Sequence, residues 1–554
     1  MFVLDPYAAR SCPLKVHNAF HPGLARPDAA PPPRLPGGAE FTTSVLDRVA
    51  AGAASVADLR GLAAEPSQVQ EAACLAALAA GTDVVIGGLL PRDRDGHRSG
   101  RPDLLVRDGS GYVPGTVKYQ RVVDVRRDDL PATFSALADL PARAMSTGWR
   151  YRWHWRWQNS LQLAHLWRLL GATGHQAVRP WGLVIGNDEI EGEGTRATWL
   201  DLTEPAVPPA PGQVAEQGAP GDPIPPVSAL ARYDHEFALR VDIAELASAA
   251  EPEDPPLLRP VVSFECTHCI WWTVCREQLD DDDISLRINK SPLDTHEIAV
   301  LREAGIETVH QLASTDIDAL LPDYLPRVAH RPGAEDRLRL AQRRSRLLLE
   351  GVQLQRTTAG PIPLPRAPLE IDIDVETSRD DRVYLWGFWV AGGDGAGSYH
   401  AFSSFCDLDD AGELALARAA MTWLRDLVDG SDALVFHYSD YEVVRLRRLA
   451  PPDDEVMQWA VGFAEDHFQD LFAAVRQHFF GANGLGLKVV ASAGAGFHWR
   501  DDDPGGLNSM RWFDDAVHSP SEAARAQART RVLEYNEDDV KATWHLRRWL
   551  RELT

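Results

Sequence analysis

Long apolar runs are absent from this 554-residue sequence. None approaches the roughly eighteen consecutive apolar residues that a membrane-spanning helix needs. The first residues, MFVLDPYAARSCPLK, also lack the basic and then apolar order of a secretory signal. The sequence therefore predicts a cytoplasmic protein without a membrane partner.

Cysteine is scarce, and an excess of positive charge is missing. Six cysteines are too few for a disulfide framework in a chain of this length. The net charge of -24 argues against a protein that coats nucleic acid through its overall field. It does not exclude a nuclease, because carboxylates that hold divalent cations add negative charge where phosphate is cut.

The composition, 45% hydrophobic and 25% charged, is that of folded globular domains, and the length predicts more than one of them. We expect a multidomain α/β protein. Its predicted parts are an α/β domain over 1–280, a helical, helix-hairpin-helix-like connector over 281–360 and a second α/β domain over 361–554.

The order of patterns within the first part indicates its α/β class. Short apolar runs separated by Gly and Asp turns over 82–118 predict consecutive strands. Helical spacing precedes them over 69–81 and follows them over 157–174, and another apolar run over 180–188 predicts a further strand.

Acidic residues alternate along the first predicted strand of the last part. The sequence LEIDIDVETS places Asp372, Asp374 and Glu376 on one face, with apolar residues between them on the other. Three carboxylates on a buried strand repel one another unless cations lie beside them, so we favour metal ligation over an exposed acidic edge. Tyr535 and Asp539 share one face of a predicted helix near the C-terminus.

The segments DVE, FHYSDYE and YNEDD together resemble the DEDD exonuclease superfamily in its tyrosine-containing variant, and more closely the YprB-like RNase H-fold domains. The resemblance implies two Mg²⁺ or Mn²⁺ ions and 3′ to 5′ phosphodiester hydrolysis. The implied residues are Asp374, Glu376, Tyr535 and Asp539.

The second motif of that family departs from its usual form here. The family commonly has an Asn followed by an Asp, whereas this sequence has Tyr438 and Glu442 at those places. Glu442 is our first choice for the fourth acid. Asp440 and Asp470 are its alternatives.

Three cysteines in CTHCIWWTVC have the spacing of a metal or cluster loop: Cys266, Cys269 and Cys275. Cys12 is a distant candidate for a fourth ligand. Together they resemble the iron-sulfur clasp of AddB and of RecB-like CRISPR-associated nucleases, which implies a [4Fe-4S] cluster, with zinc as the alternative. We interpret Cys74 and Cys406 as small buried residues.

The same families have a PD-(D/E)xK nuclease fold, and its motifs have counterparts here. They are Asp103 in GRPDLLV, Lys118 in GTVKYQ and Gln162 in QLAHL. Thr116 stands where the second acid is usual, and Leu166 stands where a Tyr is usual.

Because Thr is a poor Mg²⁺ ligand, this N-terminal site is expected to be impaired or to use another acid such as Glu71. The resemblance covers almost the whole chain and matches the order of RecB-like nucleases. It implies a nuclease whose C-terminal domain carries most of the catalysis, a 3′ to 5′ exonuclease acting on DNA more than RNA, in repair or recombination. A non-catalytic nucleic-acid-binding scaffold and an RNA-processing exoribonuclease remain alternatives.

Overall fold

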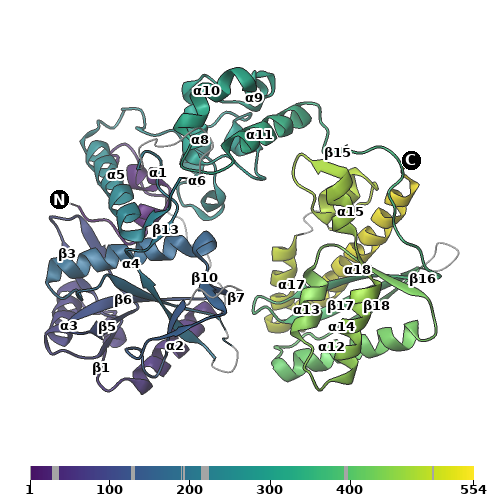
Figure 1. Cartoon of the computed structure of the whole chain (residues 1–554), viewed down its shortest axis with the longest axis horizontal. Helices are drawn as coiled ribbons and strands as arrows, with labels where there is room; N and C mark the ends of the chain where they lie inside the picture. Colours follow the sequence, from purple (N-terminus) through teal and green to yellow (C-terminus); the bar gives the residue numbers. More distant parts are fainter. Residues whose placement is uncertain are drawn as a thin grey trace. The chain divides into compact units, whose positions relative to one another are not determined.

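The computed structural model divides into two compact units (Figure 1). Unit 1 comprises residues 1–287 and 292–339, and unit 2 comprises residues 288–291 and 340–554. None of the described helices is long and apolar enough to cross a membrane. The structure describes residues 2–27, 37–125, 132–188, 190, 194–213, 224–391, 397–501 and 505–554.

Unit 1 is built around a mixed sheet of eight described strands in the order β1-β2-β5-β6-β11-β12-β8-β9. Strands β2, β5 and β6 are antiparallel neighbours, and β11 runs parallel to β6. The sheet strands are β1 (Val56–Asp58), β2 (Val84–Ile86), β5 (Leu104–Asp108), β6 (Gly111–Lys118), β8 (Ala132–Ala136), β9 (Ala144–Ser146), β11 (Trp181–Gly186) and β12 (Arg196–Asp201). Three short pairs flank it: β3 (Leu90–Asp93) with β4 (Arg98–Gly100), β7 (Val123–Val125) with β10 (Trp149–Tyr151), and β13 (Pro205–Val207) with β14 (Val227–Ser228).

The helix α4 (Trp153–Thr173) packs on β6 and β11, and it ends at Gly174, whose φ of +75° suits a residue without a Cβ (Figure 1). Its Leu161 and Leu163 lie in the same core as the apolar residues of the central strands. The helix, strands, helix and strand expected from the sequence are all present here. The other helices of this part are η1 (Ala8–Arg10), α1 (Pro13–Phe20), α2 (Gly38–Gly52), η2 (Arg60–Leu62), α3 (Ser67–Ala79), α5 (Ala229–Ala249), η3 (Phe264–His268) and α6 (Trp272–Arg276).

The predicted connector is helical, and the two units share it. Its second helix, α8, begins after Asp294, whose carboxylate accepts hydrogen bonds from the backbone N–H groups of His296 and Glu297 in the first turn. Its elements are α7 (Ile284–Arg287), α8 (Thr295–Glu303), α9 (Val309–Ser314), α10 (Ile317–Arg327) and α11 (Ala334–Leu349).

Unit 2 contains a five-stranded sheet in the order β18-β17-β16-β19-β20. Its strands are β16 (Leu369–Thr377), β17 (Val383–Ala391), β18 (Gly397–Ser403), β19 (Ala433–His437) and β20 (Phe468–Asp470). The first three are antiparallel, whereas β19 runs parallel to β16 and β20 parallel to β19. The strand with the alternating acids, β16, is therefore central. A separate pair joins β15 (Leu354–Arg356) to β21 (Phe479–Gly481).

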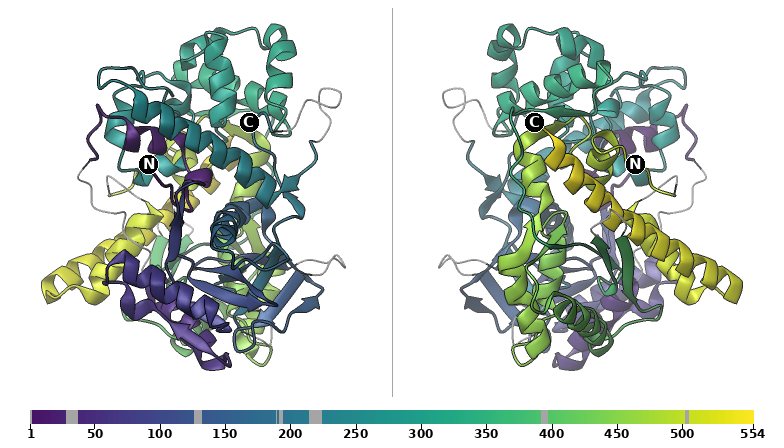
Figure 2. Two further views of the ribbon diagram at one scale, coloured as in Figure 1. Left: turned by 90° about the vertical axis from the view of Figure 1, so that its left-hand side faces the viewer. Right: turned by 90° about the vertical axis from the view of Figure 1, so that its right-hand side faces the viewer.

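Helices cover both faces of this sheet. Alternate side chains of β16 point to opposite faces, so the apolar and the acidic side chains contact different helices. Ile371, Ile373 and Val375 share a core with α12 (Asp410–Val428) and α14 (Glu455–His467). The long helix α18 (Glu522–Glu552), yellow in Figure 2, packs on β16 and β17 and carries the partners of the β16 acids. The remaining helices are α13 (Tyr441–Arg448), α15 (Leu471–His478), α16 (Leu487–Ala493) and α17 (Gly506–His518).

Candidate metal centre

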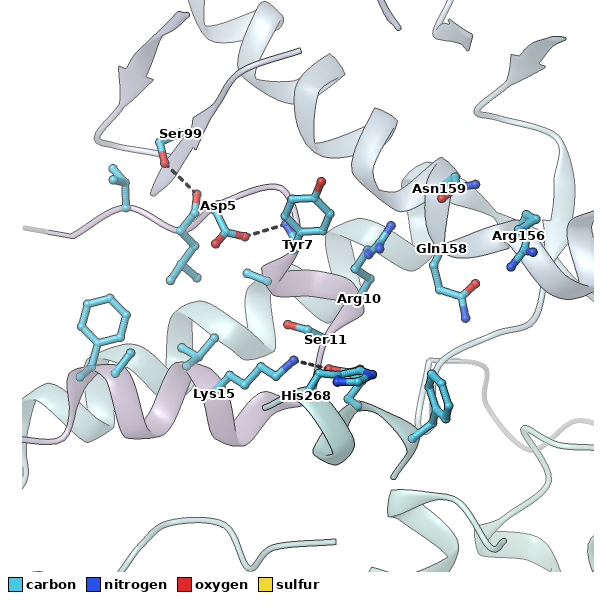
Figure 3. Close-up of a pocket in the computed structure, with 18 of the residues that line it drawn as sticks. Asp5, Tyr7, Arg10, Ser11, Lys15, Ser99, Arg156, Gln158, Asn159 and His268 are labelled. Atoms are coloured by element: carbon cyan, nitrogen blue, oxygen red, sulfur yellow. Dashed lines mark hydrogen bonds and ion pairs between the residues drawn. The ribbon is translucent and has the colours of Figure 1, made fainter. Parts of the chain in front are cut away.

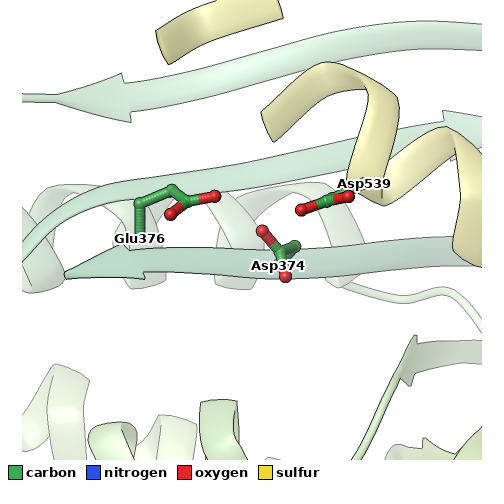
Figure 4. Close-up of side chains that lie close together, drawn as sticks. All are labelled: Asp374, Glu376 and Asp539. Atoms are coloured by element: carbon green, nitrogen blue, oxygen red, sulfur yellow. The ribbon is translucent and has the colours of Figure 1, made fainter. Parts of the chain in front are cut away.

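Three carboxylates converge in unit 2: Asp374, Glu376 and Asp539, which we call the acidic cluster. Each offers one oxygen, and these oxygens all lie within 4.8 Å of one another. Asp374 and Glu376 project from β16, and Asp539 comes from α18, 163 positions further along the chain from Glu376, so that the three face one another (Figure 4). Glu376 and Asp539 are buried, and Asp374 is half-buried.

The third acid of the strand, Asp372, has a different role. Its carboxylate is buried and accepts hydrogen bonds from Arg547 of α18, at 3.1 Å from Nε and 2.7 Å from Nη2. The alternation was predicted correctly, but the cation that balances Asp372 is a side chain of the protein. Only Asp374 and Glu376 of this strand therefore contribute to the acidic cluster.

The acids of the cluster resist ionisation together. Burial, followed by repulsion from Asp539, Glu376 and Glu442, raises the pKa of Asp374 well above its ordinary value. Burial and repulsion from Asp539 raise the pKa of Glu376 to about 8, and burial raises that of Asp539. A bound cation would reverse these shifts, because it stabilises the ionised carboxylates.

A lysine lies beside the cluster. Lys488 of α16 donates a hydrogen bond to the Tyr535 hydroxyl at 2.6 Å, and its Nζ lies 3.7 Å from Asp539 Oδ2. Burial, then repulsion by Asp539, raises the pKa of the Tyr535 phenol, so that Tyr535 stays neutral. Tyr535 can therefore act as a neutral hydrogen-bond donor next to the carboxylates.

Further side chains hold the carboxylates in place. Trp499 Nε1 donates to Asp539 at 2.6 Å, Ser509 donates to Glu376 at 2.5 Å, and Asn536 Nδ2 donates to Asp374 at 2.7 Å. Gly387 is paired with Asp374 across the sheet, and a Cβ there would lie 1.7 Å from the Asn536 side-chain oxygen. A glycine at this position leaves the room that Asn536 occupies.

Sequence reasoning missed these supporting residues. Asn536 had a usable signal, since it follows Tyr535 directly and lies three residues before Asp539 on the same helix. Lys488 and Trp499 lie in the stretch 487–506, which is similar to one in YprB-like domains, but no signal distinguished these two residues within it. They lie about 40 residues or more before their partners, and only the packing of α16 and the following loop against α18 brings them together.

The candidates for the fourth acid lie in different surroundings. The Asp470 carboxylate accepts hydrogen bonds from two backbone N–H groups, those of Ser439 and Phe472, and Asp440 is exposed. Glu442 is buried and close enough to raise the pKa of Asp374. Its Oε2 lies 3.6 Å from His437 Nδ1 and has no hydrogen-bond partner among the described residues. Glu442 remains our predicted fourth acid.

The raised pKa of Glu376 predicts a pH-dependent response to metal. Without metal, the stability that comes from keeping this carboxyl neutral is present below pH 4.5, the ordinary pKa of a glutamate, and is lost as the pH rises through about 8. A divalent cation competes with this proton. We expect Mn²⁺ to raise the unfolding temperature more at pH 8 than at pH 6, by about 5 °C. Thermal unfolding with Mn²⁺ or EDTA measures this, and Glu376→Gln should reduce the difference between the two pH values.

The residues of the predicted N-terminal site also come together, in unit 1. Lys118 Nζ donates to Gln162 Oε1 at 2.8 Å, and burial lowers the pKa of Lys118 to about 8. Asp103 Oδ2 accepts hydrogen bonds from the Thr116 hydroxyl at 2.9 Å and from the Val117 N–H at 2.8 Å. A hydroxyl that donates to Asp103 thus stands where a second carboxylate would be expected.

The two other residues weighed for this site lie on helices. Glu71 is half-buried on α3, and its suggested role as a replacement acid stays a prediction. Leu166 is fully buried on α4, where it acts as an apolar core residue.

Four cysteines that are distant in sequence line one small pocket of unit 1, and we call them the cysteine site: Cys12, Cys266, Cys269 and Cys275. Burial, followed by repulsion from the other three, raises the pKa of the Cys275 thiol to about 11. Cys74 is buried in an apolar cluster, as expected. The prediction that Cys406 is buried was wrong: it follows β18 in a loop and is exposed.

Unit 2 is therefore an α/β domain with a carboxylate cluster at its central strand. Two of the acids come from β16, and the third comes from α18. Residues 371–551 match the family model of the RNase_H superfamily. The RNase H-like fold predicted for the C-terminal part is thereby confirmed, whereas the PD-(D/E)xK fold of the N-terminal part stays a prediction. No curated protein and no solved structure matches the chain.

Proposed function

We propose that this protein is a metal-dependent nuclease that hydrolyses phosphodiester bonds in its RNase H-like domain. The observation that carries the proposal is the acidic cluster itself: three carboxylates within 4.8 Å on the central strand and the facing helix. Domains of this superfamily generally cut phosphodiester bonds. Buried acids with raised pKa values are also typical of functional sites.

The donor set fits Mg²⁺ or Mn²⁺, which prefer carboxylate oxygens. Asp374, Glu376 and Asp539 would hold the cation, and the buried carboxylate of Glu442, beside His437, lies close enough to act on Asp374. When bound, such ions lower the pKa of a water molecule and stabilise negative charge on phosphate oxygens.

The protein's own side chains then position the reactants. Tyr535 is neutral and stands at the edge of the cluster, so its hydroxyl can orient the attacking water. Lys488 donates a hydrogen bond to that hydroxyl and adds a positive charge beside the carboxylates, where it would stabilise negative charge on a substrate phosphate.

The role of Lys488 can be tested by removing its charge while keeping its length. We expect Lys488→Met to lower kcat about a hundredfold with little change in KM, because the ammonium group acts on the reacting groups rather than on distant parts of the substrate. Lys541→Met is the matched control, since Lys541 pairs with Glu537 on the outer part of α18 and should be dispensable. Equal kcat values for the two variants would refute this role.

We further propose that the substrate is DNA and that the enzyme degrades it from the 3′ end, in repair or recombination. The support is the resemblance of the DVE and YNEDD segments to tyrosine-containing DEDD exonucleases. The test uses DNA and RNA strands labelled at either end, with Mg²⁺, Mn²⁺ or EDTA. A ladder of shortened 5′-labelled DNA is expected; no cleavage of any strand in either metal would overturn the proposed function.

For the cysteine site we propose a [4Fe-4S] cluster, which would join the N-terminal segment to the loop around η3. The support is the spacing of the three cysteines in CTHCIWWTVC and the lining of one small pocket by all four cysteines. Zinc is the alternative, since thiolates suit both metals.

A second candidate function is nucleic-acid binding by unit 1 without cleavage there. The observation that favours it is Thr116, whose hydroxyl donates to Asp103 in the place of a second acid. In this proposal unit 1 holds the substrate and unit 2 cuts it.

A further inference from the structure

Unit 1 contains a cavity of about 870 Å³ (Figure 3) that adjoins the predicted N-terminal site, since Lys118 Nζ lies 5.8 Å from the ring centre of the lining residue Tyr7. Its walls come from the N-terminal segment through α1, the first turns of α4 and η3 of the cysteine loop, together with Ser99 of β4 and Gln120 after β6. This volume is within the range of roughly 300–1,000 Å³ of ligand sites in proteins. It is large enough for one or two nucleotide units.

Arg10 gives the cavity its most unusual feature. Its side chain rises into the cavity beside Tyr7, and its Nη1 is buried without a hydrogen-bond partner among the described residues (Figure 3). No carboxylate in the described part of the chain forms an ion pair with it. The carboxylates of Glu265 and Asp5 act on the charge of Arg10, but neither is bonded to Nη1, so an anionic ligand can accept a hydrogen bond from this buried nitrogen.

The other polar groups of the wall agree with an anion. Arg156 lies across the cavity, and its Nε is bonded to the Arg121 carbonyl. Lys15 is neutralised by Glu265 at 2.5 Å, and Asp5 accepts a hydrogen bond from the backbone N–H of Tyr7. The lining thus has three cationic and two anionic side chains, an excess of one positive charge in a chain of net charge -24.

An aromatic ring stands at the same cavity. Phe264, the first residue of η3, is 87% exposed and lines the cavity. An apolar ring this exposed gains nothing from the protein core. Next to a group that binds phosphate, it offers a face on which a nucleobase can stack.

We propose that this cavity binds a single-stranded segment of nucleic acid, with a phosphate between Arg10 and Arg156 and a base stacked on Phe264. The phosphate accepts a hydrogen bond from Arg10 Nη1, and the base covers the exposed ring of Phe264. Only the choice of nucleic acid over another phosphate compound rests on the proposed nuclease function. Sequence-independent contacts of this kind would hold a strand while unit 2 acts on it.

The test measures binding of a fluorescein-labelled oligothymidine of roughly twelve nucleotides to the full chain, by fluorescence anisotropy in EDTA so that nothing is cut. We expect Phe264→Ala to raise Kd about tenfold, because one stacked base is lost. Phe264→Trp should bind as the wild type does. Leu246→Ala removes another exposed apolar side chain of unit 1, 59% exposed, and should leave Kd unchanged.

A second measurement tests the phosphate contact. Arg156→Gln should reduce the slope of log Kd against log salt concentration by about 0.7, the value for one phosphate contact on a single strand. Wild-type Kd in Phe264→Ala, or no binding by the wild type, would overturn the proposal. Competition by inorganic phosphate as strong as that by the unlabelled strand would also overturn it.

The outcomes separate this inference from the proposed function. Asp374→Asn should bind the strand as the wild type does but fail to cut it. If the wild type cuts DNA and Phe264→Ala binds normally, only the strand site is refuted. If binding depends on Phe264 and nothing is cut in any metal, only the nuclease proposal is refuted.

Discussion

Replacing Asp374 with Asn is expected to lower the rate of DNA cleavage at least about a thousandfold, which corresponds to about 4 kcal/mol of transition-state stabilisation. The substitution keeps the size of the side chain but removes the charge that faces Glu376 and Asp539. A neutral amide is a weaker ligand for a divalent cation than a carboxylate. Initial rates with Mn²⁺ at saturating DNA measure the effect.

The same substitution should not weaken the fold. Because burial and repulsion raise the pKa of Asp374, its ionised form is unfavourable in the metal-free domain, and a neutral amide avoids that cost. We therefore expect the unfolding temperature in EDTA to equal or exceed that of the wild type. Asp426→Asn, at an exposed position of α12, is the control for loss of one negative charge and should keep full activity. Full activity in Asp374→Asn would contradict the assignment.

If the cysteine site holds the proposed [4Fe-4S] cluster, replacing Cys269 with Ala is expected to remove its iron and to destabilise unit 1. A structural metal contributes its binding free energy to folding, so a loss of at least about 3 kcal/mol should follow. For a unit of this size that corresponds to a fall of about 4 °C in the unfolding temperature. Iron and sulfide analysis, visible absorbance and thermal unfolding report the two effects.

Cys406→Ala is the matched control, since Cys406 is exposed and belongs to unit 2. It should keep both the iron content and the unfolding temperature. If the wild-type protein is colourless and contains one zinc ion, the cysteine site binds zinc and the proposed cluster is wrong. Wild-type protein without any metal would refute the cysteine site as a metal site.

The sequence predicted the acids of the centre because their pattern is local. Asp374 and Glu376 alternate on one strand, and Tyr535 and Asp539 lie four residues apart on one helix, so periodicity alone places each pair on one face. The resemblance to DEDD nucleases then predicted that the two pairs lie in one RNase H-like domain. The family match over residues 371–551 confirms that fold.

The rest of the centre depends on tertiary packing. Arg547 forms an ion pair with Asp372, which lies 175 residues earlier, and no local sequence pattern predicts this pair. The hydrogen bond from Lys488 to Tyr535 also joins two separate helices and has no local sequence signal. Local patterns give the face that a side chain occupies, but the partner on another element is decided by how helices pack on the sheet.

The N-terminal unit shows the same contrast. The strands and helices around β6 were predicted from their periodicity, and Asp103, Lys118 and Gln162 were placed by motif. The cavity beside Arg10 could not be foreseen, because its walls come from segments about 150 and 250 residues away from the N-terminus.

The most direct test of the central claim compares three proteins in one assay: the wild type, Asp374→Asn and Lys118→Met, each with Mn²⁺ and end-labelled DNA. The proposed location of catalysis in the RNase H-like domain predicts that Asp374→Asn is inactive and that Lys118→Met keeps most of the wild-type rate. Cleavage that survives in Asp374→Asn and disappears in Lys118→Met would contradict it and place the nuclease centre in unit 1.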